Sequence, residues 1–180
     1  MSSHDGWVMG QVESAKRADV HQRFREMYEA TLAEVYGFLS LRVGGDRALA
    51  EDLTADAYAA AVRRYNAGRS EEVTISWLIT VARRRLIDHW RKQSTAANNV
   101  VRLVPPPVVD DSGWVDHHAV VTALSRLSHD ERAALVLRHI DGYSVADVAE
   151  LLGRTPKATE SLLGRARTAF RTAFEEANHD

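Results

Sequence analysis

The chain has 180 residues, 45% of them hydrophobic and 27% charged, a balance that excludes a disordered or fibrous protein and allows one medium domain or two small ones. The absence of cysteine excludes a disulfide framework and a thiolate metal site. The formal net charge of −2 argues against DNA binding through bulk electrostatics, so any DNA contact is expected to be local or assisted by a partner.

The sequence also lacks the signals of a membrane or secreted protein. No apolar run of about 18 residues occurs. The opening MSSHDGWVMG does not have the basic-then-apolar layout of a signal peptide. We therefore expect a cytoplasmic protein without membrane insertion.

The N-terminal half of the chain is predicted to be helical after a short arm. Residues 1–18 are polar and mixed in charge, and we interpret them as a loose, flexible arm. Over residues 19–93, apolar side chains recur at three- and four-residue steps, glycines interrupt the pattern and no proline occurs. This predicts a first domain of amphipathic helices, of which the segment from residue 75 onward is the most basic.

A linker is predicted between residues 94 and 116. Helical periodicity is lost there, and three consecutive prolines at positions 105–107 exclude a helix and favour an extended path. The stretch therefore separates two helical units and is expected to be flexible.

The second helical unit is predicted over residues 117–176. Ser128 and Glu131 have the spacing of a capping box, which marks a helix start. Two short segments end at Gly142 and Gly153, and Pro156 opens a longer helix. A short helix, a glycine turn and a second helix have helix-turn-helix proportions, although packing alone also produces such hairpins.

Two stretches in the first half and one in the second carry a family resemblance. ALSRLSHDERAALVLRHIDGYSVADVAELLGRTPKATESLLGRARTAF, residues 123–170, resembles region four of sigma factors, which recognises the promoter −35 element. AEDLTADAYAAAVRR, residues 50–64, resembles the region-two helix that grips RNA polymerase, and SWLITVARRRLIDHWRK, residues 76–92, resembles the helix that reads the −10 element. The chain is thereby identified as a member of the bacterial RNA polymerase sigma factors, in the small extracytoplasmic-function (ECF) subfamily of the sigma-70 family.

The resemblance implies an all-α protein of two small domains, a region 2 helical bundle and a region 4 helix-turn-helix, joined by the flexible proline-containing linker. It implies a promoter-reading subunit that catalyses nothing, needs no cofactor or metal, and binds core RNA polymerase and promoter DNA. Proteins of this kind are often held inactive by an anti-sigma factor, which is an expected further partner.

The resemblance also assigns site residues. Carboxylates one helical turn apart are expected to meet basic residues of core polymerase: Glu51, Asp52 and Asp56. The −10 strand is expected to be held near the loop 66–76 by basic residues of the following helix: Arg83, Arg84, Arg91 and Lys92. The −35 duplex is expected to meet outward residues of the last helix: Lys157, Glu160, Ser161, Leu162, Arg165 and Arg167.

Leu162 is expected at the flank of that outward face, where it would pack on a thymine methyl. The chain departs from the family's usual asparagine, valine, lysine and arginine at four positions: Arg84, Thr159, Glu160 and Leu162.

Other interpretations of the same residues remain open at this stage. A helix-turn-helix regulator would bind duplex DNA as a dimer without polymerase, and a protein-interaction module would use the helices for a regulatory partner. The acidic residues of the first domain and the basic residues of its last helix also fit ordinary solvated faces. A metalloenzyme is disfavoured because the histidines, including His117, His118, His129 and His139, lack metal-site spacing.

Overall fold

The computed structural model describes the backbone of residues 3–93 and 117–177 and the side chains of 18–93 and 118–177. Every regular element in this part of the chain is helical, which confirms the all-α prediction. The elements are α1 (Ser3–Arg42), α2 (Arg47–Asn66), the 3₁₀ turn η1 (Ser70–Glu72), α3 (Ile75–Gln93), α4 (His117–Ser125), α5 (His129–Leu135), the π-helical turn η2 (Val136–Ile140), α6 (Val145–Leu152) and α7 (Pro156–Ala177). The predicted linker 94–116 lies outside the described residues.

Helices α1, α2 and α3 form the first domain around a shared apolar core. One face of α2 buries small side chains such as Ala50 and Ala57, so α1 and α3 approach it closely. The turn between α1 and α2 uses Gly44 and Gly45 at φ +66° and +75°, a region that side chains other than glycine rarely adopt. Asp46 then caps α2, since its carboxylate accepts a hydrogen bond from the Leu49 backbone N–H at 3.1 Å.

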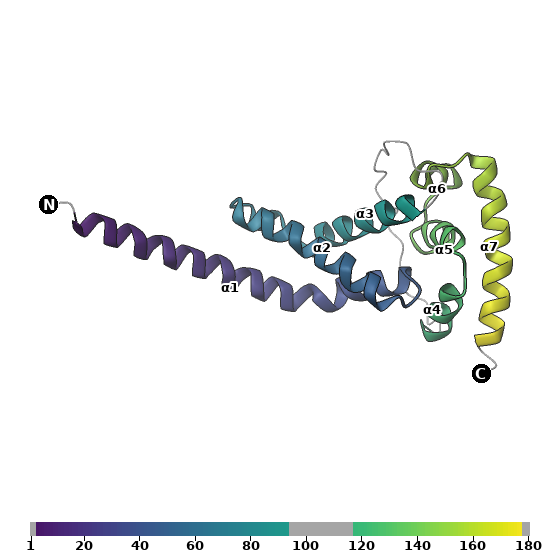
Figure 1. Ribbon diagram of the computed structural model, residues 1–180, viewed down its shortest axis with the longest axis horizontal. Helices are drawn as coiled ribbons and strands as arrows, with labels where there is room; N and C mark the ends of the chain where they lie inside the picture. Colours follow the sequence, from purple (N-terminus) through teal and green to yellow (C-terminus); the bar gives the residue numbers. More distant parts are fainter. Residues whose placement is uncertain (1–2, 94–116, 178–180) are drawn as a thin grey trace.

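Helix α1 extends further toward the N-terminus than the sequence predicts. It begins at Ser3, whereas an irregular arm was expected up to residue 18. In residues 3–17 good helix formers outnumber the two glycines; they include Gln11, Glu13, Ala15 and Lys16. Once the packed C-terminal part of α1 is helical, the helix therefore extends through this segment. In Figure 1 this end of α1 projects well away from the other helices.

Capping signals set the short helices of the second domain. The predicted capping box at α5 is confirmed, because Ser128 N–H donates to Oε2 of Glu131 at 3.2 Å. A second box begins α6, where Asp147 N–H donates to Ser144 Oγ at 3.1 Å and Ser144 N–H donates to Asp147 Oδ2 at 3.2 Å. Gly153, at φ +65°, ends α6, and Pro156 opens α7 as predicted.

The two domains pack directly against each other, a contact that the sequence did not predict. Helix α3 packs on α5 and α6, and α1 packs on α4. In Figure 1, α7 lies on the outer side of the second domain, with α5 between it and α3. A Cβ at Gly44 would meet the Leu124 backbone carbon at 3.0 Å, so glycine at this turn also permits the close approach of the second domain.

Trp90 offers a test of the packing in the first domain. Its side chain is 2% exposed in α3. We expect Trp90→Ala to lower the free energy of unfolding by about 3–5 kcal/mol through the lost burial and the cavity left behind. Val62→Ala, at an exposed position of α2, should change it by less than about 0.5 kcal/mol. Urea denaturation followed by circular dichroism measures both, and equal midpoints for the two variants would contradict the assigned core.

A pair of histidines across the domain contact makes stability depend on pH. The rings of His89 in α3 and His129 in α5 lie 5.7 Å apart between centroids. Burial lowers the pKa of both side chains; the other imidazole lowers that of His129 further, whereas Asp46 opposes the shift at His89. Because the packed form disfavours their protonation, its stability is complete above about pH 6.5 and falls as the pH drops below that value.

The urea midpoint of the native chain should therefore decrease between about pH 7.5 and pH 5.5. Replacing both residues, as His89→Asn with His129→Asn, should reduce this dependence to the part that His139 contributes, since burial also lowers its pKa. His21→Asn, at an exposed position of α1, should leave the dependence unchanged. The same slope in the double variant and the native chain would exclude the histidine pair as its source.

Candidate polymerase and nucleic-acid interface

The outward face of α7 presents hydrogen-bonding and cationic groups near its N-terminus. Thr155 caps the helix, since its Oγ1 accepts a hydrogen bond from the Ala158 backbone N–H at 3.2 Å. Thr159, Leu163 and Ala166 form the buried stripe. This leaves five of the predicted DNA-binding residues exposed: Lys157, Glu160, Ser161, Arg165 and Arg167.

The expectation for Leu162 is wrong. Its side chain is 3% exposed and belongs to the hydrophobic core. Leu162 follows Thr159 by three residues and precedes Ala166 by four, which places it on the buried side of the helix. It therefore does not face a thymine methyl.

The cations on α7 are available to a ligand. Within the described part of the chain, no salt bridge involves Lys157, Arg165 or Arg167. Lys157 lies in the first turn, where the helix dipole is positive and free backbone N–H groups also favour an anion. Glu160 is the one predicted site residue of this face that opposes a phosphate.

The basic residues of α3 do not act as one set. Arg84 and Lys92 are exposed, and Arg91, seven residues after Arg84, lies on the same side of the helix but is partly buried. Arg83 points instead toward the second domain. Its Nη2 lies 3.5 Å from Oδ1 of Asp141, and its side chain is only 13% exposed.

The loop before α3 is fixed to the helices on both sides of it. Arg64 of α2 forms an ion pair with Glu72 of η1, and its guanidinium lies 4.8 Å from the centroid of the Trp77 ring. Thr74 caps α3 by accepting a hydrogen bond from the Trp77 N–H at 3.2 Å. An aromatic ring thus lies at the start of the basic helix, a feature that the sequence analysis did not identify.

The acidic residues of α2 lie beside an aromatic groove. Glu51, Asp52 and Asp56 are all exposed, although Glu51 accepts from Arg47 at 2.7 Å and Asp56 lies 4.0 Å from Arg85. A groove of about 760 Å³ runs along the same side of α1 and α2, lined by Tyr28, Glu29, Leu32, Ala33, Tyr36, Glu51, Thr54, Ala55 and Tyr58. The sequence interpretation found the carboxylates and missed the tyrosines.

The tyrosines of this groove are held in place by specific contacts. The rings of Tyr28 and Tyr58 meet edge to face with centroids 4.7 Å apart. The hydroxyls of Thr31 and Tyr58 share a hydrogen bond of 2.8 Å, and burial raises the pKa of Tyr58. The spacing of Tyr28, Leu32 and Tyr36 at four-residue steps was the signal that could have identified this face.

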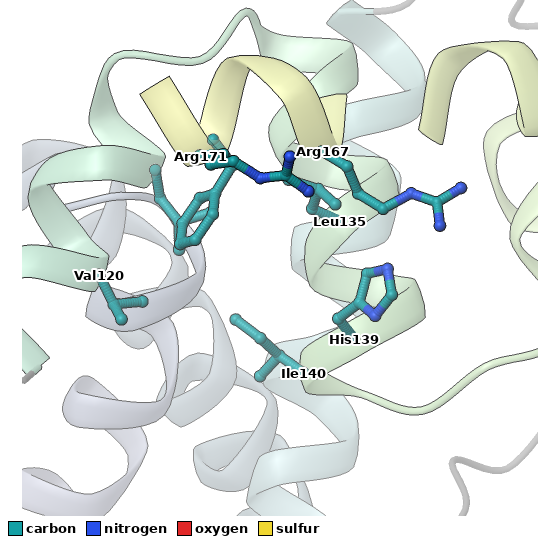
Figure 2. Close-up of a pocket in the computed structure, with 8 residues that line it drawn as sticks. Val120, Leu135, His139, Ile140, Arg167 and Arg171 are labelled. Carbon is teal, nitrogen blue, oxygen red and sulfur yellow. The ribbon is translucent and has the colours of Figure 1, made fainter. Parts of the chain in front are cut away.

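A second groove, of about 420 Å³, lies in the second domain (Figure 2). Its apolar lining comes from α4, α5, η2 and α7, namely Val120, Leu124, Leu135, Ile140 and Phe170. His139, Arg167 and Arg171 add cationic or titratable groups to its lining, and burial, followed by the charges of Arg138 and Arg167, lowers the pKa of His139. The groove therefore suits an apolar ligand that carries negative charge at its edge.

Comparisons with known proteins identify two family regions along the chain. The family described as Sigma-70 region 2 matches residues 27–95, and Sigma-70, region 4 matches residues 117–170. The ECF RNA polymerase sigma factor BldN of Streptomyces coelicolor is 30% identical, over 94% of this chain and 67% of that protein. SigX of Bacillus subtilis, also an ECF RNA polymerase sigma factor, is 31% identical over 87% of this chain and 86% of its own.

Among solved structures, the sigma factor RpoE in complex with the anti-sigma factor NepR from Bartonella quintana is similar at 23% identity and a TM-score of 0.47. The match covers 84% of this chain and 96% of that one.

A chain with both regions in this order is a sigma-70 protein. Its relatives place it more narrowly, and it belongs to the ECF sigma factors. It is thus a non-catalytic subunit that directs transcription initiation with RNA polymerase, which confirms the prediction from the sequence. No helix among the described residues is long and apolar enough to cross a membrane. The same part of the chain contains no cluster of three His, Asp or Glu side chains suited to a metal ion.

Proposed function

We propose that the two domains divide the work of promoter recognition. The first, residues 19–93, binds core RNA polymerase and holds the −10 strand, the linker 94–116 spans the distance between sites, and the second, residues 117–176, binds the −35 duplex. The observation that carries this proposal is the exposed face of α7 on a helix-turn-helix scaffold. A lysine and two arginines on that face have no carboxylate partner among the described residues.

The −35 contact is proposed to combine phosphate and base-edge contacts. Lys157 and Arg167 supply charge for phosphates, while Ser161 and Arg165 lie where a recognition helix meets base edges in the major groove. Glu160 is proposed to accept a hydrogen bond from a cytosine amine. Because these cations are few and the whole chain is slightly acidic, binding needs polymerase to raise the local concentration of the domain at the promoter.

A set of alanine variants in run-off transcription tests this assignment. With purified core polymerase and a cognate promoter, Lys157→Ala, Ser161→Ala and Arg165→Ala should each reduce initiation about five- to tenfold or more, because each removes a contact to the −35 duplex. Thr172→Ala, at an exposed position near the other end of α7, is the matched control. Wild-type run-off from all three variants would show that this face does not read the promoter.

The −10 contact is proposed to use the exposed part of α3. Arg84, Arg91 and Lys92 neutralise phosphates of an unpaired strand, and the Trp77 ring beside Arg64 offers a surface on which a base stacks. Arg83 belongs to the same set by sequence, but it contacts the second domain in this structure. Its access to DNA therefore depends on the arrangement of the domains.

The polymerase contact is proposed to combine the α2 carboxylates with the tyrosine groove beside them. Glu51, Asp52 and Asp56 give charge complementarity to a basic surface, and the groove supplies apolar area that carboxylates alone do not. Aromatic side chains that are rigid and partly exposed, such as Tyr28, commonly contribute most of the energy of such contacts.

Charge reversal on α2 should disrupt this contact. We expect Asp52→Lys combined with Asp56→Lys to weaken binding to core polymerase about tenfold or more, with a loss that shrinks at high salt. Tyr28→Ala should weaken binding by a similar factor that salt does not change. Glu150→Lys combined with Glu175→Lys, at exposed positions of α6 and α7, makes the same change in net charge and is the control. Fluorescence anisotropy measures the affinities, and wild-type binding by both α2 and Tyr28 variants would refute this surface.

We also propose that the groove of the second domain receives an anti-sigma factor. An apolar floor with Arg167 and Arg171 at its edge fits an amphipathic helix that carries carboxylates.

The protein is proposed to act in the cytoplasm, where the polymerase is found.

A further inference from the structure

We propose that the free protein is held closed by a latch across its two domains, and that this latch competes with promoter DNA for Arg83. The latch consists of the Asp141 carboxylate in the second domain and the guanidinium groups of Arg42 and Arg83 in the first. The competition rests on the proposed −10 role of α3, whereas the closed state rests on the packing of the domains alone.

The latch is buried at the point where the domains meet. Arg42, in the last turn of α1, donates from Nε and Nη2 to Oδ1 of Asp141 at 3.1 and 2.7 Å. Arg83 of α3 approaches the same oxygen at 3.5 Å. The side chains of Asp141 and Arg42 are only 1% and 10% exposed. Phe38 lies under both guanidinium groups, 3.6 Å from that of Arg42 and 5.0 Å from that of Arg83.

The π-helical turn aims Asp141 at the first domain. Its N–H donates to the Val136 carbonyl at 2.8 Å, five residues back, and the Tyr143 N–H donates to the Leu137 carbonyl at 3.0 Å. Arg138 then donates to the Tyr143 carbonyl at 2.7 Å, which fixes the turn that follows. Such π-helical turns are rare and recur at functional sites.

The geometry of the latch makes its ion pairs weak. Both Arg42 nitrogens bond a single carboxylate oxygen rather than the two oxygens of a fork-to-fork pair. Within the described residues, Oδ2 of Asp141 and Nε of Arg83 are buried without a hydrogen-bond partner. Two cations also share one anion. An ion pair with these defects recovers little of the cost of burying its charges, so a competing ligand displaces it readily.

The other polar contacts between the domains have the same character. Arg132 of α5 donates to the Val43 carbonyl of the first domain at 2.7 Å, and burial lowers its pKa. His89 faces His129 with Asp46, Asp130 and Lys92 nearby. The contact therefore combines these polar groups with buried apolar side chains of both domains, which belong to one hydrophobic cluster.

The closed form does not fit a promoter engaged at both elements. The −10 and −35 positions are roughly 25 base pairs apart, about 85 Å at 3.4 Å per base pair. Domains that share a buried carboxylate do not span that distance, so engagement of both elements requires the Asp141 contact to break. Its rupture frees Arg83 for a phosphate of the −10 strand.

Distance measurements on the free protein test the closed state. The chain has no cysteine, so spin labels at Arg25→Cys and Thr172→Cys, both exposed positions, report on one domain each. Without polymerase or DNA, the labelled native background should give one narrow distance distribution. Asp141→Asn should raise the open population about tenfold or more, because it removes the buried carboxylate charge that Arg42 and Arg83 share.

Glu150→Gln removes one carboxylate from an exposed position and should leave the distribution unchanged. Arg42→Gln should open the chain as Asp141→Asn does. Circular dichroism establishes that both variants keep their helices. A broad distribution in the native background, or native distances in both latch variants, would overturn the proposal whatever the promoter assignment.

A disulfide across the contact tests the competition with promoter DNA. A Cβ at Gly45 lies 2.9 Å from Cγ1 of Val121, which brings cysteines at these positions within disulfide reach. Oxidised Gly45→Cys with Val121→Cys should lose run-off transcription at least about tenfold and recover it with reductant; neither single variant should respond to oxidation. Equal run-off from the oxidised and reduced chain would overturn the competition.

Discussion

Among the described side chains, the Asp141 carboxylate is the only acidic group of the second domain in ionic contact with the first. Helices α1 and α3 of the first domain both meet the second domain at this group. Arg42 ends α1, Arg83 occupies the middle of α3, and both converge on one oxygen at the end of the π-helical turn. Around this point the turn between α1 and α2 approaches α4 closely enough to require Gly44. The contact sets which basic side chains of α3 face solvent and which face the other domain.

The surfaces proposed for polymerase and for the −35 duplex lie away from that contact. Helix α7 lies on the outer side of the second domain (Figure 1), and Glu51 of α2 lines the tyrosine groove formed with α1. Under the proposed assignment, polymerase and a −35 duplex have access to the closed protein, whereas the −10 strand does not reach Arg83. The proposal thereby links partner binding to domain separation.

Each domain is stabilised by local features of its helices. Small residues on α2 permit close packing of the first domain. Helices begin at the capping residues Asp46, Ser128 and Ser144, and α6 ends at Gly153. These features are local, so they hold each domain together whether or not the domains touch. The contact between the domains differs from them, because its ion pairs and buried apolar side chains join residues far apart in the chain.

Sequence alone determined the helical class, the capping box at Ser128, the start of α7 at Pro156 and the sigma-factor family, because each depends on periodicity or on residues close together in the chain. It misplaced Leu162, whose side chain is buried. The apolar pattern of one helix does not fix the boundary between its buried and exposed sides to a single residue. Only the tertiary structure decided that Arg83 meets Asp141 and that Tyr28 and Tyr58 share a groove with Glu51. Those contacts join residues from separate helices, and the pattern within one helix carries no information on which neighbour it will meet.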